Sequence, residues 1–340
     1  MTPFPQKRTA ASLMELLVAM TILLILMGII LGVTHQTGQL WRGTNSKIAS
    51  FQDARAAFDA LSRNLSQATL NHYYDYYDKS WKRRTDADTD FVPANYGRSS
   101  DLHFLCGPAD VLLTSPALGA KQSHAVFFQA PIGRVDDKTA YASANSLVNT
   151  IGYYVEFSVN TNATDRPKFL RDVQAMKQAR FRLMEWIEPS EKLRLYDASL
   201  NAADPKAWLT AVASADTQCR VIAENILALI ILPEAQPGDT TLAPAYSYDS
   251  APTVYDSTRS HLLPPLLKVT LVAIDRDSAA RLNQRYGDTM PPLYPQNAFK
   301  SAAAYESDLA QLEQTLQGKT GLPKISYRIF TTTINTRDNR

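Results

Sequence analysis

The stretch "AASLMELLVAMTILLILMGIILGV", residues 10–33, contains one charged side chain, Glu15, near the start of an apolar run. The 18 residues from Leu16 to Val33 carry no charge and are rich in Leu, Ile and Met. A helix of this length is about long enough to cross the hydrocarbon core of a bilayer. The sequence therefore predicts a transmembrane helix over residues 11–34.

Basic residues before the apolar run predict its orientation. Lys7 and Arg8 precede the run, and no Lys or Arg follows it until Arg42. Because basic flanks stay on the cytoplasmic side, we expect residues 1–10 to be cytoplasmic and the main part of the chain to lie across the membrane. A secretory signal peptide would carry small residues at a cleavage site after the run, and "GVTH", residues 32–35, does not give that pattern.

Glu15 has two interpretations. A carboxylate near the edge of a bilayer costs about 2 to 3 kcal/mol on insertion scales, so it is usually paired or functional. It either lies at headgroup level, solvated by water, or has a partner in an assembly.

Gly28 and Gly32 also have two interpretations. Their spacing lets a second helix approach closely, but glycines at this spacing are also ordinary in a membrane helix.

The composition indicates neither a nucleic-acid partner nor a metal. The chain has 340 residues, with 35 Lys and Arg against 33 Asp and Glu, which gives a net charge of +2 and no general attraction for nucleic acid. Cys106 and Cys219 lie far apart in sequence and either form a disulfide or remain two thiols. Two cysteines and five scattered histidines do not make a metal framework, so we expect no cofactor.

Residues 35–70 are expected to continue the helix out of the membrane. In "NSKIASFQDARAAFDALSRNLSQATL", residues 45–70, five apolar side chains fall on one helical stripe. They are Ile48, Phe51, Phe58, Leu61 and Leu65. The stripe predicts that this part of the helix packs on a domain formed by residues 71–340.

Seven segments of that domain have the apolar pattern of strands, with β-branched and aromatic residues. They are residues 101–107, 124–130, 151–159, 180–188, 228–232, 265–275 and 325–335. Residues 220–227 predict a short helix or turn, and residues 277–287 and 301–318 predict helices that end at glycines. This order predicts an α+β fold in which a long N-terminal helix packs on an antiparallel sheet.

Two polar insertions, residues 71–100 and 234–261, are expected at the surface of the domain. In the first, Asp86, Asp88 and Asp90 resemble the opening of a calcium loop, but the Gly and Glu that complete the EF-hand pattern are absent. A solvated turn is therefore favoured over a calcium site. The mixture of aromatic and basic residues before it also contains acidic residues, which argues against binding of single-stranded nucleic acid.

The core "SLMELLVAM", residues 12–20, after a short basic leader resembles the class III signal of type IV pilins and type II secretion pseudopilins. The resemblance implies that a prepilin peptidase cuts between Ala10 and Ala11 and methylates the new amine. Glu15 would then be the fifth mature residue and would pair with the amine of an adjacent subunit, which specifies the register of assembly. The family usually has Gly before the cut, where this chain has Ala10.

The likeness extends through most of the chain. "FQDARAAFDALSRNLSQA", "VIAENILALIIL", "LPPLLKVTLVAID" and "YRIFTTTIN" occur in the order seen in J-type minor pseudopilins of type II secretion. With "GYYVEF" and "RFRLMEW", the chain looks most like the Verru_Chthon cassette protein C family. This resemblance implies a pilin-like fold and assembly with other minor pseudopilin subunits. Leu13, Leu16, Leu17, Gly28 and Gly32 would pack helices together in the membrane.

No sequence motif indicates catalysis. GxSxG, HExxH, Walker and GxGxxG patterns are all absent. His103 and His124 lie in predicted strands, where a histidine is more often a structural hydrogen-bonding group, and Glu185 and Glu188 are expected at the surface.

We therefore expect a minor pilin-like structural subunit, not an enzyme. Its partners would be the prepilin peptidase, other pilin-like subunits and the lipid bilayer. Its location would be the bacterial inner membrane, with the domain outside the cytoplasm. The alternatives are an anchored extracytoplasmic enzyme or binding protein with a pilin-like export signal, and a plain single-pass protein that is never cut.

Overall fold

The structure is a computed structural model. It describes residues 13–84, 90–115, 118–141, 146–159, 178–201, 204–213, 219–252, 254–295, 297–319 and 323–336. The chain divides into two units, Met1–Ala49 and Ser50–Arg340. Helix α1 (Leu13–Ser66) begins in the first unit and ends in the second.

In the first unit, α1 has an apolar segment, Leu13–Gly38, of 26 residues that is long and apolar enough to cross a membrane. None of its side chains is buried in the protein. Its threonines bond back to the helix: the hydroxyl of Thr34 donates to the carbonyl of Ile30, at 2.7 Å, and Thr21 and Thr37 do the same to their own preceding turns. Hydroxyl groups satisfied in this way are tolerated in lipid.

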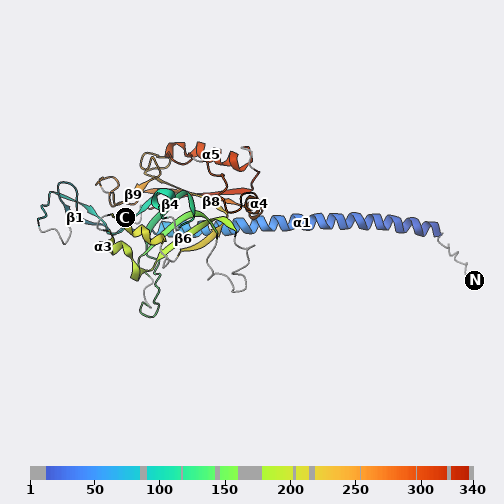
Figure 1. The fold of residues 1–340 in the computed structure, drawn as a ribbon, viewed down its shortest axis with the longest axis horizontal. Coiled ribbons are helices and arrows are strands. Elements are labelled where there is room, and N and C mark those ends of the chain that lie inside the picture. The colour runs from blue at the N-terminus through green and yellow to red at the C-terminus, as the bar shows by residue number, and fades with distance from the viewer. Residues whose placement is uncertain are drawn as a thin grey trace, which may run out of the picture. The chain divides into compact units, whose positions relative to one another are not determined.

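The second unit is built mainly from antiparallel strands (Figure 1). The strands are β1 (Tyr73–Tyr77), β2 (Asn95–Ser99), β3 (Leu105–Pro108), β4 (Ala120–Ala130), β5 (Asn149–Val159), β6 (Ala179–Glu188), β7 (Cys219–Glu224), β8 (Ile226–Glu234), β9 (Tyr248–Asp249), β10 (Leu266–Ile274) and β11 (Tyr327–Asn335). The short helices among the described residues are α2 (Ala109–Leu112), α3 (Ala198–Asn201), α4 (Arg276–Tyr286) and α5 (Tyr305–Leu316), and 3₁₀ turns are described at Ser190–Lys192, Arg194–Tyr196, Ala207–Ala213 and Ala302–Ala304.

These strands form three sheets. The largest has six strands in the order β7-β6-β5-β4-β3-β9, the second has the order β11-β10-β8, and β1 pairs with β2 alone. Every pair within them is antiparallel, for example β5 with β6 from Thr150 opposite Glu188 to Val159 opposite Ala179. The predicted α+β class with antiparallel sheets is therefore confirmed.

The last turns of α1 lie in the main hydrophobic core, against residues of both larger sheets. Phe58, Leu61 and Leu65 are buried there, as the sequence predicted, and Phe51 is half-buried against the same cluster. The side chain of Ile48 lies outside the described residues. The sheet residues of this core include Val126, Phe128, Ile151, Val155, Leu183, Leu229, Ile231, Val269 and Leu271. One face of each sheet thus packs with the helix.

The other face of each sheet is covered as well, which explains why many strands are apolar on both sides. Leu282 of α4 and Leu312 and Leu316 of α5 pack on the three-stranded sheet. Trp208, in the turn Ala207–Ala213, packs with Phe127 and Trp186 of the six-stranded sheet. The domain is therefore layered, with the helix end inside.

Residues 220–227, predicted as a short helix or turn, contain no helix and are strand except at Asn225. Strand β7 is followed after one residue by β8, and that residue, Asn225, has a φ of +62°. Its N–H donates to the carbonyl of Phe181, at 2.7 Å, and its carbonyl accepts from the N–H of Ile274, at 2.9 Å. Asn225 is thus hydrogen-bonded to both sheets, and Asn is one of the few residues that accept a positive φ.

The expected surface loop at residues 234–261 is also partly wrong. It contains β9, which pairs with β3, and Tyr246 and Tyr248 are buried side chains. Residues 101–107 form a strand only from Leu105. The first insertion holds the β1–β2 pair, and Asp86 and Asp88 of the calcium prediction lie outside the described residues.

Candidate functional site

The exposed part of α1 is the first candidate site. Glu15 is the only Asp, Glu, Lys or Arg between Leu13 and Gly38. In the described part of the chain its carboxylate has no hydrogen bond or ion pair. Lys7 and Arg8, together with the expected processing junction Ala10 and Ala11, lie outside that part.

The predicted packing residues of this helix are all open to the surroundings. Leu13, Leu16 and Leu17 are exposed apolar side chains. A Cβ added at Gly28 or Gly32 would meet nothing within 4 Å. This helix therefore presents apolar side chains and two small residues that lipid or another helix can contact.

A buried polar network fixes the other end of α1 to the six-stranded sheet. Asn64 donates from Nδ2 to the hydroxyl of Tyr153, at 2.7 Å, and that hydroxyl donates to Oε1 of Glu185, also at 2.7 Å. The guanidinium of Arg220 donates to Oε2 of the same carboxylate. The network joins the helix to β5, β6 and β7.

Glu185 and Glu188 do not lie at the surface, where their sequence context predicted them. Both side chains are buried. A carboxylate in a strand usually marks the face that is exposed to solvent, but this strand is buried on both faces. The partners of Glu185 come from distant segments, so the sequence does not show them. Burial raises the pKa of Glu188 to about 7, against the lowering effect of the Arg194 backbone N–H and side chain.

His103 and Asp249 form the pair that most resembles a catalytic dyad. Nε2 of His103 lies 2.7 Å from Oδ1 of Asp249, and Nδ1 accepts from the indole N–H of Trp208 at 3.3 Å. Lys206 binds the other oxygen of Asp249, at 2.8 Å. Because both ring nitrogens of His103 are engaged, the ring has no lone pair to offer to a substrate proton. The arrangement is that of a structural histidine.

The charges around Asp249 keep its carboxylate ionised. Burial raises the pKa of Asp249, but hydrogen bonds and charges from His103 and Lys206 outweigh burial and hold that pKa well below its usual range. The carboxylate of Asp249 therefore joins β9 to His103 and to Lys206, which lies just before the 3₁₀ turn Ala207–Ala213.

His124 has a different structural role, at a bulge in β4. Its Nδ1 accepts from the N–H of Ile231 in β8, at 3.1 Å, and Nε2 donates to the carbonyl of Phe299, at 3.2 Å. Ser123 accepts from the N–H of Leu229 at 3.1 Å. Side chains of β4 thus satisfy backbone groups of β8 that no neighbouring strand of the described chain takes.

The two cysteines do not form a disulfide. Cys106 is buried, Cys219 is half-buried, and neither is in a disulfide. Burial raises the pKa of the Cys106 thiol well above its usual range, so this thiol is unreactive. Of the two possibilities left open by the sequence, the structure has two separate thiols.

Comparisons of the chain with protein-family models, with curated proteins and with solved structures each found no match. Function is therefore inferred from the residues and contacts of the chain itself. Among the described residues no group of three or more His, Cys, Asp or Glu side chains could hold a metal ion.

Proposed function

We propose that this chain is a minor pilin-like structural subunit that assembles by helix packing into a type II secretion-like or type IV pilus-like complex. The observation that carries the proposal is the division of α1. The segment Leu13–Gly38 is apolar and exposed, whereas Phe58, Leu61 and Leu65 are buried in an antiparallel domain. A helix with one end for a membrane or a helical assembly and the other in a folded domain is the arrangement that the pilin-like resemblance implies.

The second observation that supports the proposal is the presence of Glu15, the single acidic residue of the apolar segment. A carboxylate with apolar neighbours is costly in lipid, and pairing it with a cation removes most of that cost. We infer that a prepilin peptidase cuts between Ala10 and Ala11, and that the new α-amino group pairs with Glu15 of an adjacent subunit. The subunit would act at the tip or in the initiation complex, in the bacterial inner membrane, with its N-terminus cytoplasmic before the cut.

Protein sequencing of the N-terminus tests the proposal. The full chain is extracted from membranes of cells that also produce a prepilin peptidase, and we expect the sequence to begin at Ala11. An inactive peptidase is the control. A chain that still begins at Met1 with the active enzyme would contradict the processing step and favour a plain anchor.

Substitution of Glu15 tests assembly separately from processing. Glu15→Gln removes the charge with little change in shape, so the chain should still insert in the membrane. We expect Glu15→Gln to lose co-purification with its partner subunits. Addition of Gln36→Glu to this variant puts a carboxylate at the other end of the apolar segment, and it should not restore co-purification. Normal assembly of Glu15→Gln would remove the register role of Glu15.

A further inference from the structure

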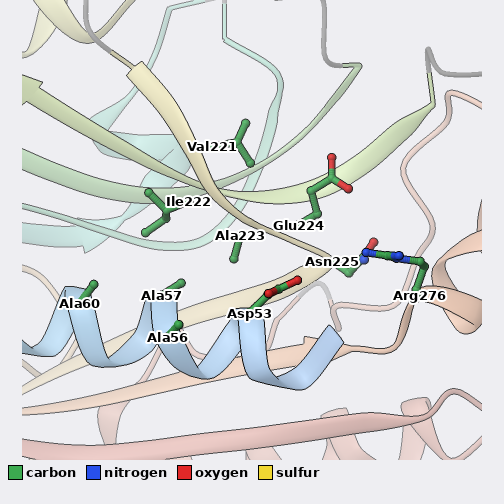
Figure 2. A pocket seen from close by; sticks show the side chains of 10 residues that line it. All are labelled: Asp53, Ala56, Ala57, Ala60, Val221, Ile222, Ala223, Glu224, Asn225 and Arg276. Carbon is green, nitrogen blue, oxygen red and sulfur yellow. The ribbon is translucent and has the colours of Figure 1, made fainter. Parts of the chain in front are cut away.

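A groove of about 450 Å³ runs between α1 and β7, wholly within the second unit (Figure 2). Its helix side is formed by one stripe of mostly small residues, and its other side by β7 and the start of α4. The lining residues are Asp53, Ala56, Ala57, Ala60, Val221, Ile222, Ala223, Glu224, Asn225 and Arg276. This volume lies in the usual range of ligand sites.

The groove follows the edge of the sheet. Residues 221–225 are consecutive, and successive side chains of a strand point to opposite faces, so all five can line one groove only where it runs along the strand's edge. Strand β7 is the terminal strand of its sheet, and no described strand pairs with its outer side. Backbone N–H and C=O groups on such an edge can pair with an added strand.

Polar groups in the groove lack partners in the described chain. Oδ1 of Asn225 is buried and has no hydrogen bond, although the residue is only 4% exposed. Asp53 and Arg276 form no ion pair with any described residue, whereas Glu224 is paired with Arg180 at 2.9 Å. Figure 2 shows Arg276 extending from the start of α4 toward Asn225, and Asp53 pointing toward the strand. A buried acceptor without a donor is costly, and a bound N–H would remove that cost.

We propose that this groove binds an extended segment of a neighbouring pilin-like subunit, which adds as a strand to the outer edge of β7. The nature of the partner rests on the proposed function. The segment places a basic side chain against Asp53 and an acidic one against Arg276, and it donates an N–H to Asn225. Alanines at positions 56, 57 and 60 leave room for its side chains. A helix cannot make these backbone bonds, because its own N–H and C=O groups are already paired.

A second copy of this chain fits the groove less well. Among the terminal strands of the described chain, only β7 carries both a basic and an acidic residue, Arg220 and Glu224, and its free edge faces its own α1 across the groove. Pairing of two β7 edges would need the α1 of each copy to share its groove with the strand of the other copy. An extended segment from a different subunit has no such obstruction.

Site-specific photo-cross-linking in the cells that naturally make the chain tests the proposal. A small aliphatic diazirine amino acid replaces Ala56, which is exposed in the groove, in the full-length chain. The same residue at the exposed Arg63, which does not line the groove, is the positional control. We expect mass spectrometry to identify, from Ala56 only, a peptide of another pilin-like protein with a basic residue near the cross-link.

Charge reversal gives the second readout. Asp53→Lys should lower the cross-link yield at position 56 about tenfold, the factor that corresponds to about 1.4 kcal/mol. Asp59→Lys is the matched control, since Asp59 lies on the same helix, is exposed and does not line the groove. It should change the yield less than twofold.

Three outcomes would overturn the proposal: no protein cross-link at position 56, a cross-link to a second copy of the chain, or a yield that Asp53→Lys leaves unchanged. N-terminal sequencing of the same sample separates this test from that of the proposed function. A chain that begins at Ala11 but gives no cross-link refutes the groove alone. A chain that begins at Met1 and cross-links to a protein without a pilin-like N-terminus refutes both.

Discussion

At the scale of single residues, buried polar side chains join segments that are distant in sequence. Tyr153 connects α1 to β6 through Asn64 and Glu185, and His124 connects β4 to β8. Each of these groups is satisfied by a partner of the right kind, donor facing acceptor. Removal of one partner leaves the other buried without a hydrogen bond, which costs more than the bond itself contributes.

Tyr153→Phe isolates one such group. The change removes only the hydroxyl, so that Asn64 loses its acceptor and Glu185 loses a donor. We expect the free energy of unfolding to fall by about 1 to 3 kcal/mol. Urea denaturation of the detergent-solubilised chain, followed by tryptophan fluorescence, measures it. Tyr74→Phe, at an exposed tyrosine, should change stability by less than about 0.5 kcal/mol.

His124 makes stability depend on pH. Burial lowers its pKa to about 4, although the bond from Nε2 to the carbonyl of Phe299 acts in the opposite sense. The ordinary pKa of His in an unfolded chain is about 6.5, so the unfolded state takes up a proton first as the pH falls. The contribution of His124 is therefore complete above about pH 6.5 and is lost progressively down to about pH 4.

We expect wild type to lose about 2 to 3 kcal/mol through His124 between pH 7 and pH 4.5. His124→Asn keeps an acceptor for Ile231 but cannot be protonated in this range, so it should lose less over the same interval. The difference between the two proteins cancels the effects of other titrating groups, such as Glu188, whose raised pKa of about 7 acts in the opposite direction. Equal losses in the two proteins would show that His124 does not titrate in the folded state as described.

At the scale of secondary structure elements, the second part of α1 is the element around which the domain is packed. Ala54, Ala57, Phe58, Leu61 and Leu65 belong to the same core as residues of both larger sheets. The opposite side of the same turns carries Arg55 and Asp59, an exposed i, i+4 pair at 3.8 Å. Pairs of this kind contribute little to stability, so the buried stripe holds the helix in place.

Leu61→Ala tests how much the buried stripe of α1 contributes to stability. Leu61 is fully buried, and its truncation removes apolar contacts and leaves a cavity against two sheets. We expect a loss of about 2 to 5 kcal/mol in the free energy of unfolding. Asp59→Ala in the same helix should cost less than about 0.5 kcal/mol. A similar loss for the two variants, by urea denaturation, would contradict the packing described for α1.

Sequence patterns located most of these elements because they depend on local periodicity. The stripe at Phe58, Leu61 and Leu65 and the strand at residues 151–159 both follow from spacing alone. The choice between a short helix and a turn at residues 220–227 could not be made from sequence, because an Asn with positive φ between two strands looks the same in sequence as one at a helix start. The groove and the Tyr153 network join segments more than 30 residues apart, and a single sequence carries no signal of such pairings.

At the scale of the whole molecule, each of the two units has its own environment. The first unit contains an apolar helix whose side chains are exposed, and the second unit buries apolar residues in three clusters. A protein with such a helix is expected to partition into a bilayer through that helix alone.

A pair of arginines in the apolar segment tests this expectation. Leu24→Arg combined with Leu26→Arg adds two charges at the centre of the segment, each costing about 2.5 to 3.5 kcal/mol on insertion scales. We expect the chain to move from the membrane pellet to the soluble fraction or to be degraded. Gln36→Arg, at the end of the segment, should leave it in the pellet after a carbonate wash. Retention of the double variant would show that another part of the chain binds the membrane.

The single-residue connection at Asn225 has a consequence for how the domain opens. Because this residue is bonded to Phe181 and to Ile274, strand β7 cannot detach without disturbing the first bonds of β8. The two sheets should therefore open together, as one cooperative unit, and their amide hydrogens should exchange with solvent at similar free energies. A segment bound on the outside of β7 would then slow exchange in β8 and β10 too, although it touches neither strand.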